Sequence, residues 1–276
     1  MAELLSVRDL RVRFHRAAPG RCAVDGVSFS LEEGEILGLV GESGSGKTVT
    51  AMAVSGLLPR RQTEASGSVT LAGRELLHCT EAQLRAVQGS ELAVVFQEPM
   101  TSLDPVRRIG PQVEESLRAH TRLSAGERRQ RALEAMAQAE LPDPEALCRK
   151  YPHELSGGML QRVMIAAAIV SRPKLLLADE PTTALDVTIQ AQILALLKKL
   201  NRETHMAILF ISHDLHVVRK LCRRVAVMRR GRIVETGTAE ALFRAPREDY
   251  TRQLIAAIPT RDRRLLPEEP GEEASL

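Results

Sequence analysis

The chain has 276 residues, of which 44% are apolar and 26% charged, and its net charge is +3, as in an ordinary globular protein of one or two domains. No apolar run reaches the ~18 residues of a membrane span, and the first residues lack a signal-peptide pattern, so a cytosolic chain is expected. The four cysteines form no C-x-x-C pair and Trp is absent, which argues against a disulfide framework, a zinc or iron–sulfur site and a nucleic-acid groove.

The beginning of the chain predicts β structure. Leu4–Phe14 alternates apolar and polar residues in places, which favours an edge strand, and Val24–Leu31 predicts a second strand. Phe14 ends the first strand, where an aromatic ring could stack on adenine. From the residue alone, packing in the core is an equally good interpretation.

Gly41–Thr48 reads GESGSGKT and fits the phosphate-binding P-loop pattern G-x-x-x-x-G-K-[ST]. An apolar strand, Glu35–Val40, precedes it, and a helix can follow from Val49. Gly41, Gly44 and Gly46 would let backbone amides approach a triphosphate, with Lys47 reaching the β- and γ-phosphates and Thr48 binding Mg²⁺. Ser43, Ser45 and Val49 are expected at the nucleotide as well.

The middle of the chain changes from strands to helices. Gly67–Leu71 and Leu92–Phe96 predict strands, and Gln97 follows the second at the sheet edge where ligands bind. Between Glu98 and Leu155, Ile109–Thr121 and Ala125–Ala139 have helical patterns and strand signals vanish. A helical insertion between two parts of a sheet domain is therefore expected.

Carboxylates and small residues follow in the second half. Ser156-Gly157-Gly158 opens a predicted helix over 160–171, as a helix cap or a second anion cradle. A buried strand ends at Asp179 and Glu180 in the form of a Walker B segment, with Asp179 helping to hold Mg²⁺ and Glu180 able to deprotonate a water; an N-cap pair is the alternative.

The last predicted elements complete the sheet. Asp186 precedes an amphipathic helix over 188–204, and a buried strand over 206–211 leads to His213, which would face the γ-phosphate. Val225–Arg229 and Arg232–Glu235 predict a closing hairpin around Gly231. Pro259–Leu276 is rich in proline and acidic residues and predicts a disordered tail.

The order of these motifs resembles the ATP-binding subunit of an ABC transporter over about residues 4–258. This resemblance implies an α/β fold: a RecA-like P-loop NTPase core with a β-rich N-terminal subdomain (1–97 and 156–245), an inserted α-helical subdomain (98–155) and a C-terminal family segment (246–276). It also implies that two such subunits pair head to tail, so that Ser156, Gly157 and Gly158 complete the site of the partner.

The resemblance further implies a role for each motif position. Phe14 falls at the adenine-stacking aromatic, Gln97 at the Q-loop that senses Mg²⁺ and the transporter, and Glu180 at the catalytic base. His213 falls at the switch histidine, and Asp186 at the loop that touches the partner subunit. Met159 departs from the pattern, because most of the family has Gln there.

Several runs are similar to the peptide/nickel importer branch of the family. They are VGESGSGKT (40–48), FQEPMTSLDP (96–105), SGGMLQRVMIA (156–166), DEPTTALD (179–186) and DYTRQLIAAIP (249–259). No cysteine follows Cys222, so the C-terminal metal cluster of some members is not expected.

The resemblance implies an ATPase, with ATP and Mg²⁺, at the cytoplasmic face of the inner membrane. Its expected partners are two permease subunits, a related but non-identical ATP-binding subunit and an extracytoplasmic solute-binding protein, with no nucleic acid. Peptides, nickel and metallophore complexes all remain open as the solute. The alternatives are a soluble ABC-type ATPase acting on DNA or ribosomes, and an exporter component.

Overall fold

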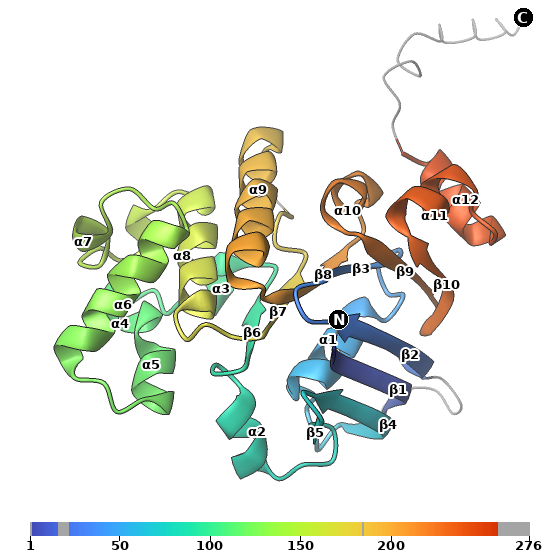
Figure 1. Ribbon diagram of the computed structural model, residues 1–276, viewed down its shortest axis with the longest axis horizontal. Coiled ribbons are helices and arrows are strands. Elements are labelled where there is room, and N and C mark those ends of the chain that lie inside the picture. Colours follow the sequence, from blue (N-terminus) through green and yellow to red (C-terminus); the bar gives the residue numbers. More distant parts are fainter. Residues whose placement is uncertain (1, 16–21, 184, 259–276) are drawn as a thin grey trace, which may run out of the picture.

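The computed structural model describes residues 2–15, 22–183 and 185–258 (Figure 1). The strands are β1 (Glu3–Phe14), β2 (Val24–Glu32), β3 (Ile36–Val40), β4 (Thr63–Leu71), β5 (Arg74–Glu75), β6 (Leu92–Val95), β7 (Leu175–Asp179), β8 (Ala207–Ser212), β9 (Arg224–Arg229) and β10 (Arg232–Thr238). The longer helices are α1 (Lys47–Ser55), α6 (Ala125–Gln138), α8 (Gly157–Ile169), α9 (Val187–Thr204) and α12 (Asp249–Ala256). The shorter ones are α2 (Glu81–Val87), α3 (Pro99–Ser102), α4 (Ile109–Val113), α5 (Glu115–His120), α7 (Pro144–Leu147), η1 (Pro152–Glu154), α10 (Leu215–Leu221) and α11 (Ala239–Arg244).

The central sheet has the strand order β10-β9-β3-β8-β7-β6, and its strands are parallel except for β10. Side chains along each strand alternate between two cores, because successive residues of a strand point to opposite faces. In β8, Leu209 packs in the core shared with the second sheet and α1, whereas Phe210 packs in the core covered by α8, α9 and α10. Burial on both faces explains why these strands read as continuous apolar runs.

The second sheet has the order β2-β1-β4-β5 and is antiparallel. The expectation that Leu4–Phe14 is an edge strand is wrong, because β1 pairs with β2 on one side and β4 on the other. Its alternation comes instead from having one face in the core and one toward solvent. β4 also begins at Thr63, earlier than the predicted Gly67, because pairing with β1 extends it.

Helices α4–α7 lie together at one end of the molecule, and α3, α4 and α6 pack against α8 (Figure 1). The helix predicted over 109–121 is divided at Glu114 into α4 and α5. Gln112 donates hydrogen bonds to the carbonyls of Asp104 and Arg107, and Ser116 bonds to Gly89, so the two halves have separate tertiary anchors. The division of the chain into core, insertion and C-terminal segment stays a prediction, and its tail over 259–276 lies outside the described residues.

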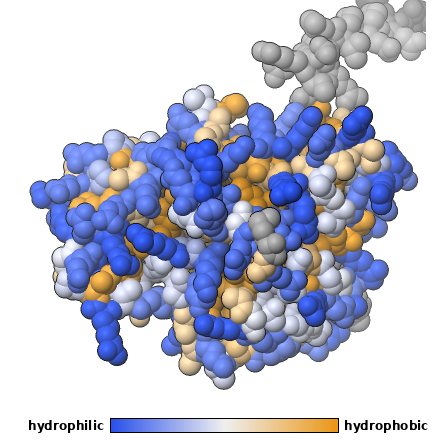
Figure 2. Space-filling model, viewed as in Figure 1, coloured by the Kyte–Doolittle hydropathy of each residue, from blue (hydrophilic) through white to orange (hydrophobic). Residues whose placement is uncertain are grey.

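On the face drawn in Figure 2, hydrophilic residues predominate, with smaller apolar areas between them. Among the helices of the described ranges, none combines the length and the apolar character that crossing a membrane requires.

Candidate active site

A cleft of about 1350 Å³ opens where the parallel strands of the central sheet end. Five strands are each followed, directly or one residue later, by a residue that lines this cleft: Gly41 after β3, Gln97 after β6, Glu180 after β7, His213 after β8 and Arg230 after β9. Ligands bind at this edge of α/β sheets because strand ends and helix starts gather there. The fold thus brings polar residues from distant parts of the chain to one place.

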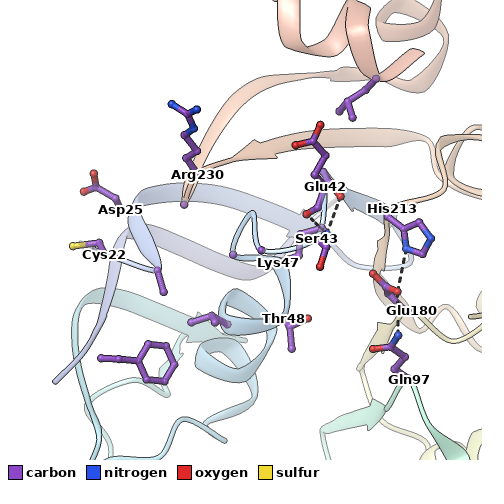
Figure 3. Close-up of a pocket in the computed structure, with 18 of the residues that line it drawn as sticks. Cys22, Asp25, Glu42, Ser43, Lys47, Thr48, Gln97, Glu180, His213 and Arg230 are labelled. Carbon is purple, nitrogen blue, oxygen red and sulfur yellow. Dashed lines mark hydrogen bonds and ion pairs between the residues drawn. The ribbon is translucent and has the colours of Figure 1, made fainter. Parts of the chain in front are cut away.

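The P-loop Gly41–Thr48 connects β3 to α1 and forms one wall of the cleft (Figure 3). Gly46 is the N-cap of α1 with a φ of 107°, and Gly44 has a φ of 76°, values that residues with a Cβ rarely adopt. A Cβ on Gly46 would lie 2.5 Å from the carbonyl oxygen of Ala23, whereas one on Gly44 would meet nothing within 4 Å. The first amides of α1 lack intrahelical partners and favour an anion in front of the loop.

Lys47 places its ammonium inside this loop. Its Nζ donates hydrogen bonds to the carbonyl oxygens of Gly41 at 2.8 Å and Glu42 at 2.9 Å, and the residue is only 4% exposed. Burial lowers the pKa of Lys47, and the nearby carboxylates of Glu180 and Asp179 oppose part of that shift. The ammonium is hydrogen-bonded only to neutral carbonyls and the carboxylates offset only part of the effect of its burial, so a phosphate would pair with it well.

Other residues of the loop differ in their placement. Ser43, Thr48 and Val49 line the cleft. Ser45 does not: it is 5% exposed, its carbonyl accepts a hydrogen bond from the Gly231 amide at 2.8 Å, and its Oγ has no partner among the described residues. An unpaired buried hydroxyl costs free energy.

Two oxygen donors meet beside Lys47. The Thr48 hydroxyl donates to Asp179 Oδ1 at 3.5 Å, and Asp179 is 8% exposed. Burial raises the pKa of Asp179, while the hydrogen bond from Thr48 acts in the opposite direction. A carboxylate and a hydroxyl are hard oxygen ligands of the type that Mg²⁺ takes, and a cation would compensate the buried carboxylate. The residues present therefore fit a magnesium ion.

Glu180 lies between Gln97 and His213 in a polar cluster at one end of the cleft (Figure 3). Its Oε2 accepts hydrogen bonds from Thr183 Oγ1 at 3.0 Å and Gln97 Nε2 at 3.4 Å, and His213 Nδ1 lies 3.1 Å from the same oxygen. Its backbone has a left-handed φ of 48°, and its amide donates to Ile211 at 2.9 Å. A strained, anchored residue with a fixed carboxylate suits a general base.

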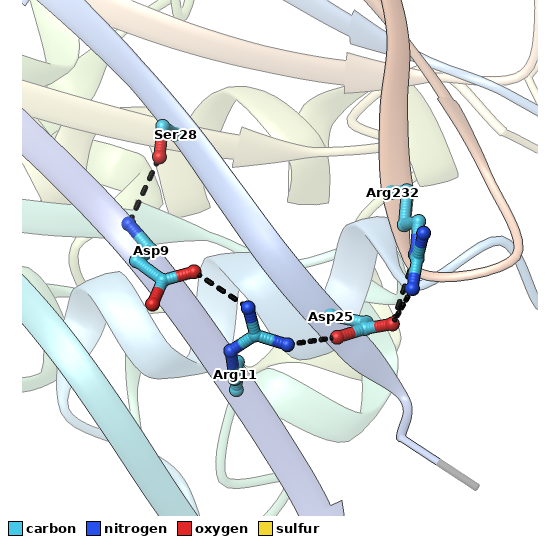
Figure 4. Close-up of polar contacts among 5 residues, drawn as sticks. All are labelled: Asp9, Arg11, Asp25, Ser28 and Arg232. Carbon is cyan, nitrogen blue, oxygen red and sulfur yellow. Dashed lines mark hydrogen bonds and ion pairs between the residues drawn. The ribbon is translucent and has the colours of Figure 1, made fainter.

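The opposite end of the cleft contains Phe14, Cys22, Asp25 and Arg230. Figure 4 shows how Asp25 ties the two sheets together: its carboxylate pairs with Arg11 of β1 and with Arg232 of β10, whose Nε donates at 2.8 Å. The Asp25 amide also donates to Gly231 at 2.8 Å. These contacts fix the end of β1, and with it Phe14, relative to the P-loop.

The remaining predicted site residues do not line this cleft. Ser156 caps α8, because its hydroxyl accepts from the Met159 amide at 3.4 Å, and Asp186 caps α9 by accepting from the Thr188 and Ile189 amides at 2.9 Å. A Cβ on Gly158 would lie 2.9 Å from Ile189, so the two helix starts adjoin each other. Ser156, Gly157, Gly158 and Asp186 therefore contribute nothing to the cleft of their own chain.

Several lining residues were not predicted from the sequence. They are Cys22, Ala23, Asp25, Glu42, Thr183, Arg230, Gly231 and Leu254. Glu42 and Thr183 belong to motifs that were recognised, so their position in the pattern could have indicated them. The others come from the start of β2, from the turn after β9 and from α12. They reach the cleft only through tertiary contacts, such as the pairing of β9 with β3, the hydrogen bond from the Ala23 amide to Val12 and that from the Asp25 amide to Gly231. In the parts of the chain that the structure describes, no three His, Cys, Asp or Glu side chains group as a metal site.

Comparison with known proteins gives relatives over most of the chain. It is 53% identical over 257 residues to a peptidoglycan transport ATP-binding protein of Agrobacterium fabrum, which covers 93% of this chain but 47% of that protein, so the chain spans about half of that relative's length. It is 46% identical over 271 residues to the dipeptide transport ATP-binding protein of Escherichia coli, covering 97% and 83%. The oligopeptide transport ATP-binding protein of Bacillus subtilis is 46% identical over 261 residues, covering 94% and 73%.

Solved structures agree with these relatives. An ATP-binding cassette captured as a dimer in a post-hydrolysis state with ADP and phosphate superposes with a TM-score of 0.75 at 29% identity, covering 86% of this chain and 99% of that one. A cassette from Clostridium perfringens that is part of an ABC transporter complex superposes with a TM-score of 0.75 at 26% identity, covering 94% and 97%. The ABC transporter family profile matches residues 24–183. Sequence, fold and cleft thus agree with the predicted RecA-like cassette and with its ATPase activity, and the chain belongs to the ABC transporter family as an ATP-binding subunit.

Proposed function

We propose that the chain is the ATP-hydrolysing subunit that powers an importer for small peptides. The observation that carries this proposal is the 46% identity, over 97% of the chain, to a dipeptide transport ATP-binding protein. The chain acts on ATP, and two permease subunits and an extracytoplasmic solute-binding protein would supply the path and the cargo. A peripheral position at the cytoplasmic face of the inner membrane follows from these partners. The soluble DNA- or ribosome-directed alternative has no support among the relatives reported above, and a nickel cargo stays a prediction.

The cleft supports a specific assignment of roles. Lys47 and the amides at the start of α1 bind the phosphates, and Phe14 would stack on adenine at the other end of the cleft. Thr48, Asp179 and Gln97 would hold Mg²⁺, which would neutralise the negative charge that develops on the phosphates.

Glu180 is the proposed general base. Three side chains converge on its Oε2, which leaves the other carboxylate oxygen to accept the proton of an attacking water. His213 is more exposed than Glu180, with 56% of its side chain accessible against 15%, so it can move from the carboxylate toward a phosphate oxygen and donate to it.

The second cradle is proposed to act in a pair of cassettes. Ser156, Gly157 and Gly158 lie at the N-terminus of α8, outside their own cleft, and would bind the γ-phosphate held by a facing subunit. Asp186 would contact that partner. The dimeric cassettes among the similar structures support pairing, and we propose a related, non-identical chain as the partner.

Replacing Glu180 by Gln tests the central assignment. The amide keeps the size of the side chain but is not a base, so ATP hydrolysis should fall by about 10²–10⁴-fold while ATP still binds. Glu98→Gln is the control, because this exposed carboxylate lies outside the cleft. In cells that lack the gene, the wild-type chain and the control should restore uptake of labelled dipeptides, and Glu180→Gln should not. Undiminished hydrolysis by Glu180→Gln would remove this residue from the base role; nickel uptake without peptide uptake would overturn the peptide assignment.

A further inference from the structure

The C-terminal helix α12 touches the P-loop through one hydroxyl. Tyr250, in the first turn of α12, accepts a hydrogen bond at its phenolic oxygen from the backbone amide of Glu42 at 3.2 Å. Tyr250 is 4% exposed. The two residues that form this contact are 208 positions apart in the chain.

The amide that Tyr250 binds belongs to the same peptide unit as the Gly41 carbonyl. That carbonyl accepts the hydrogen bond from Lys47 Nζ at 2.8 Å. A peptide unit is planar, so its carbonyl and its amide cannot be turned separately. Holding the amide from outside therefore fixes the direction of the carbonyl that receives the lysine inside the loop.

Arg229 contacts the Tyr250 ring, and the start of α12 is anchored separately by Glu235. The Arg229 guanidinium lies 4.5 Å from the centre of its ring, and Glu235 of β10 accepts from the amides of Arg247 and Glu248, at 2.9 and 3.2 Å, at the start of α12. Leu254, one helical turn after Tyr250 and on the same face of α12, lines the cleft. Burial raises the pKa of Tyr250, while the hydrogen bond from the Glu42 amide acts in the opposite direction.

We infer that Tyr250 is a positioning residue for ATP binding: it orients the Gly41–Glu42 peptide so that Lys47 is presented to the phosphates. The inference rests on the proposed function, because it requires that the cleft binds ATP. The hydroxyl touches the loop and not the reacting atoms, so its effect falls on nucleotide affinity and not on the chemical step.

Tyr250→Phe removes the hydroxyl and keeps the ring under Arg229. A neutral hydrogen bond contributes a net factor of roughly 2 to 10 in an equilibrium constant, so the Kd and KM for ATP should rise by about that factor, with kcat unchanged. Hydrogen exchange of the Glu42 amide should become faster. Tyr151→Phe is the matched control, because Tyr151 is the other tyrosine of the chain, also lies near an arginine, and stands outside the cleft; it should bind ATP as the wild type does.

Equal ATP affinity and equal Glu42 exchange in Tyr250→Phe and the wild type would overturn the inference. A loss in kcat with an unchanged KM would also overturn it. If the wild-type chain binds no ATP at all, the proposed function fails instead.

A second measurement does not require Tyr250→Phe to fold. The chain has no Trp, so emission from Tyr151→Phe comes from Tyr250 alone. Saturating ATP should change that emission, because Lys47 exchanges the Gly41 carbonyl for a phosphate; unchanged emission would refute the coupling.

Discussion

The two inner glycines of the P-loop provide a sharp test of why this segment needs glycine. Gly44 and Gly46 both have left-handed φ values, 76° and 107°, so an alanine at either position carries backbone strain. The two positions differ in the space available for a Cβ. A Cβ at Gly44 meets no atom within 4 Å, whereas one at Gly46 lies 2.5 Å from the Ala23 carbonyl oxygen and 2.7 Å from Met228 Cε.

The expected magnitudes follow from this difference. Gly44→Ala should lower the free energy of unfolding by about 1–2 kcal/mol, the cost of a left-handed residue with a Cβ. Gly46→Ala has the same strain and adds a steric clash with the Ala23 backbone carbonyl, so it should lower the free energy of unfolding by about 2–5 kcal/mol in total. In a chain of this size each kcal/mol shifts Tm by roughly 2–4 °C.

Thermal unfolding of the nucleotide-free proteins measures the difference without interference from a ligand. Gly46→Ala should melt well below Gly44→Ala, and its ATP affinity should fall more, because the start of α1 must shift to relieve the contact. Equal melting temperatures for the two variants would refute the reasoning, since strain alone would then account for both.

Two further predictions concern the second cradle and the metal site. Ser156→Ala should cost about 1 kcal/mol of stability through loss of the α8 cap, but it should reduce ATP hydrolysis of the assembled transporter far more than that of the isolated chain; an equal loss in both preparations would argue against a role in the partner's site. Asp179→Asn should raise the Tm of the nucleotide-free protein at pH 7 while reducing Mg²⁺-dependent ATP hydrolysis. The sign follows from the raised pKa of Asp179: the folded chain holds this proton more tightly than the unfolded chain, so the contribution of Asp179 to stability is present at low pH and is lost as the pH rises through its folded pKa. The gain in Tm should therefore shrink as the pH is lowered toward 3.8, the ordinary pKa of Asp. An Asp179→Asn variant less stable than the wild type at pH 7 would contradict this prediction.

Much of the fold could be predicted because its signals are local. The strands β3, β7 and β8 are buried on both faces, which makes them short continuous apolar runs, and the P-loop needs glycines at positions that a pattern can recognise. Gln97, Asp179, Glu180 and His213 could be singled out because each ends or follows a strand of the central sheet, and parallel strands deliver their carboxyl ends to one edge.

Other features depend on partners that are distant in the chain. The position of β1 inside its sheet depends on β4, and the division of the helix predicted over 109–121 depends on tertiary anchors such as Gln112 and Ser116. The absence of Ser156 and Asp186 from their own cleft also could not be read from motif spacing; there the resemblance to a paired cassette, and not the residues alone, indicated a facing subunit.

By itself, the sequence determined the chemistry of this protein, because a P-loop, a carboxylate pair after a strand and a polar strand end are each complete within a few residues. Only the tertiary structure decided which distant residues support these motifs. Asp25 joins β1 to β10, and Tyr250 reaches the Glu42 amide from the far end of the chain. The physical reason is that short apolar and glycine patterns encode local backbone geometry, whereas hydrogen bonds between distant segments exist only after the sheets and helices have packed.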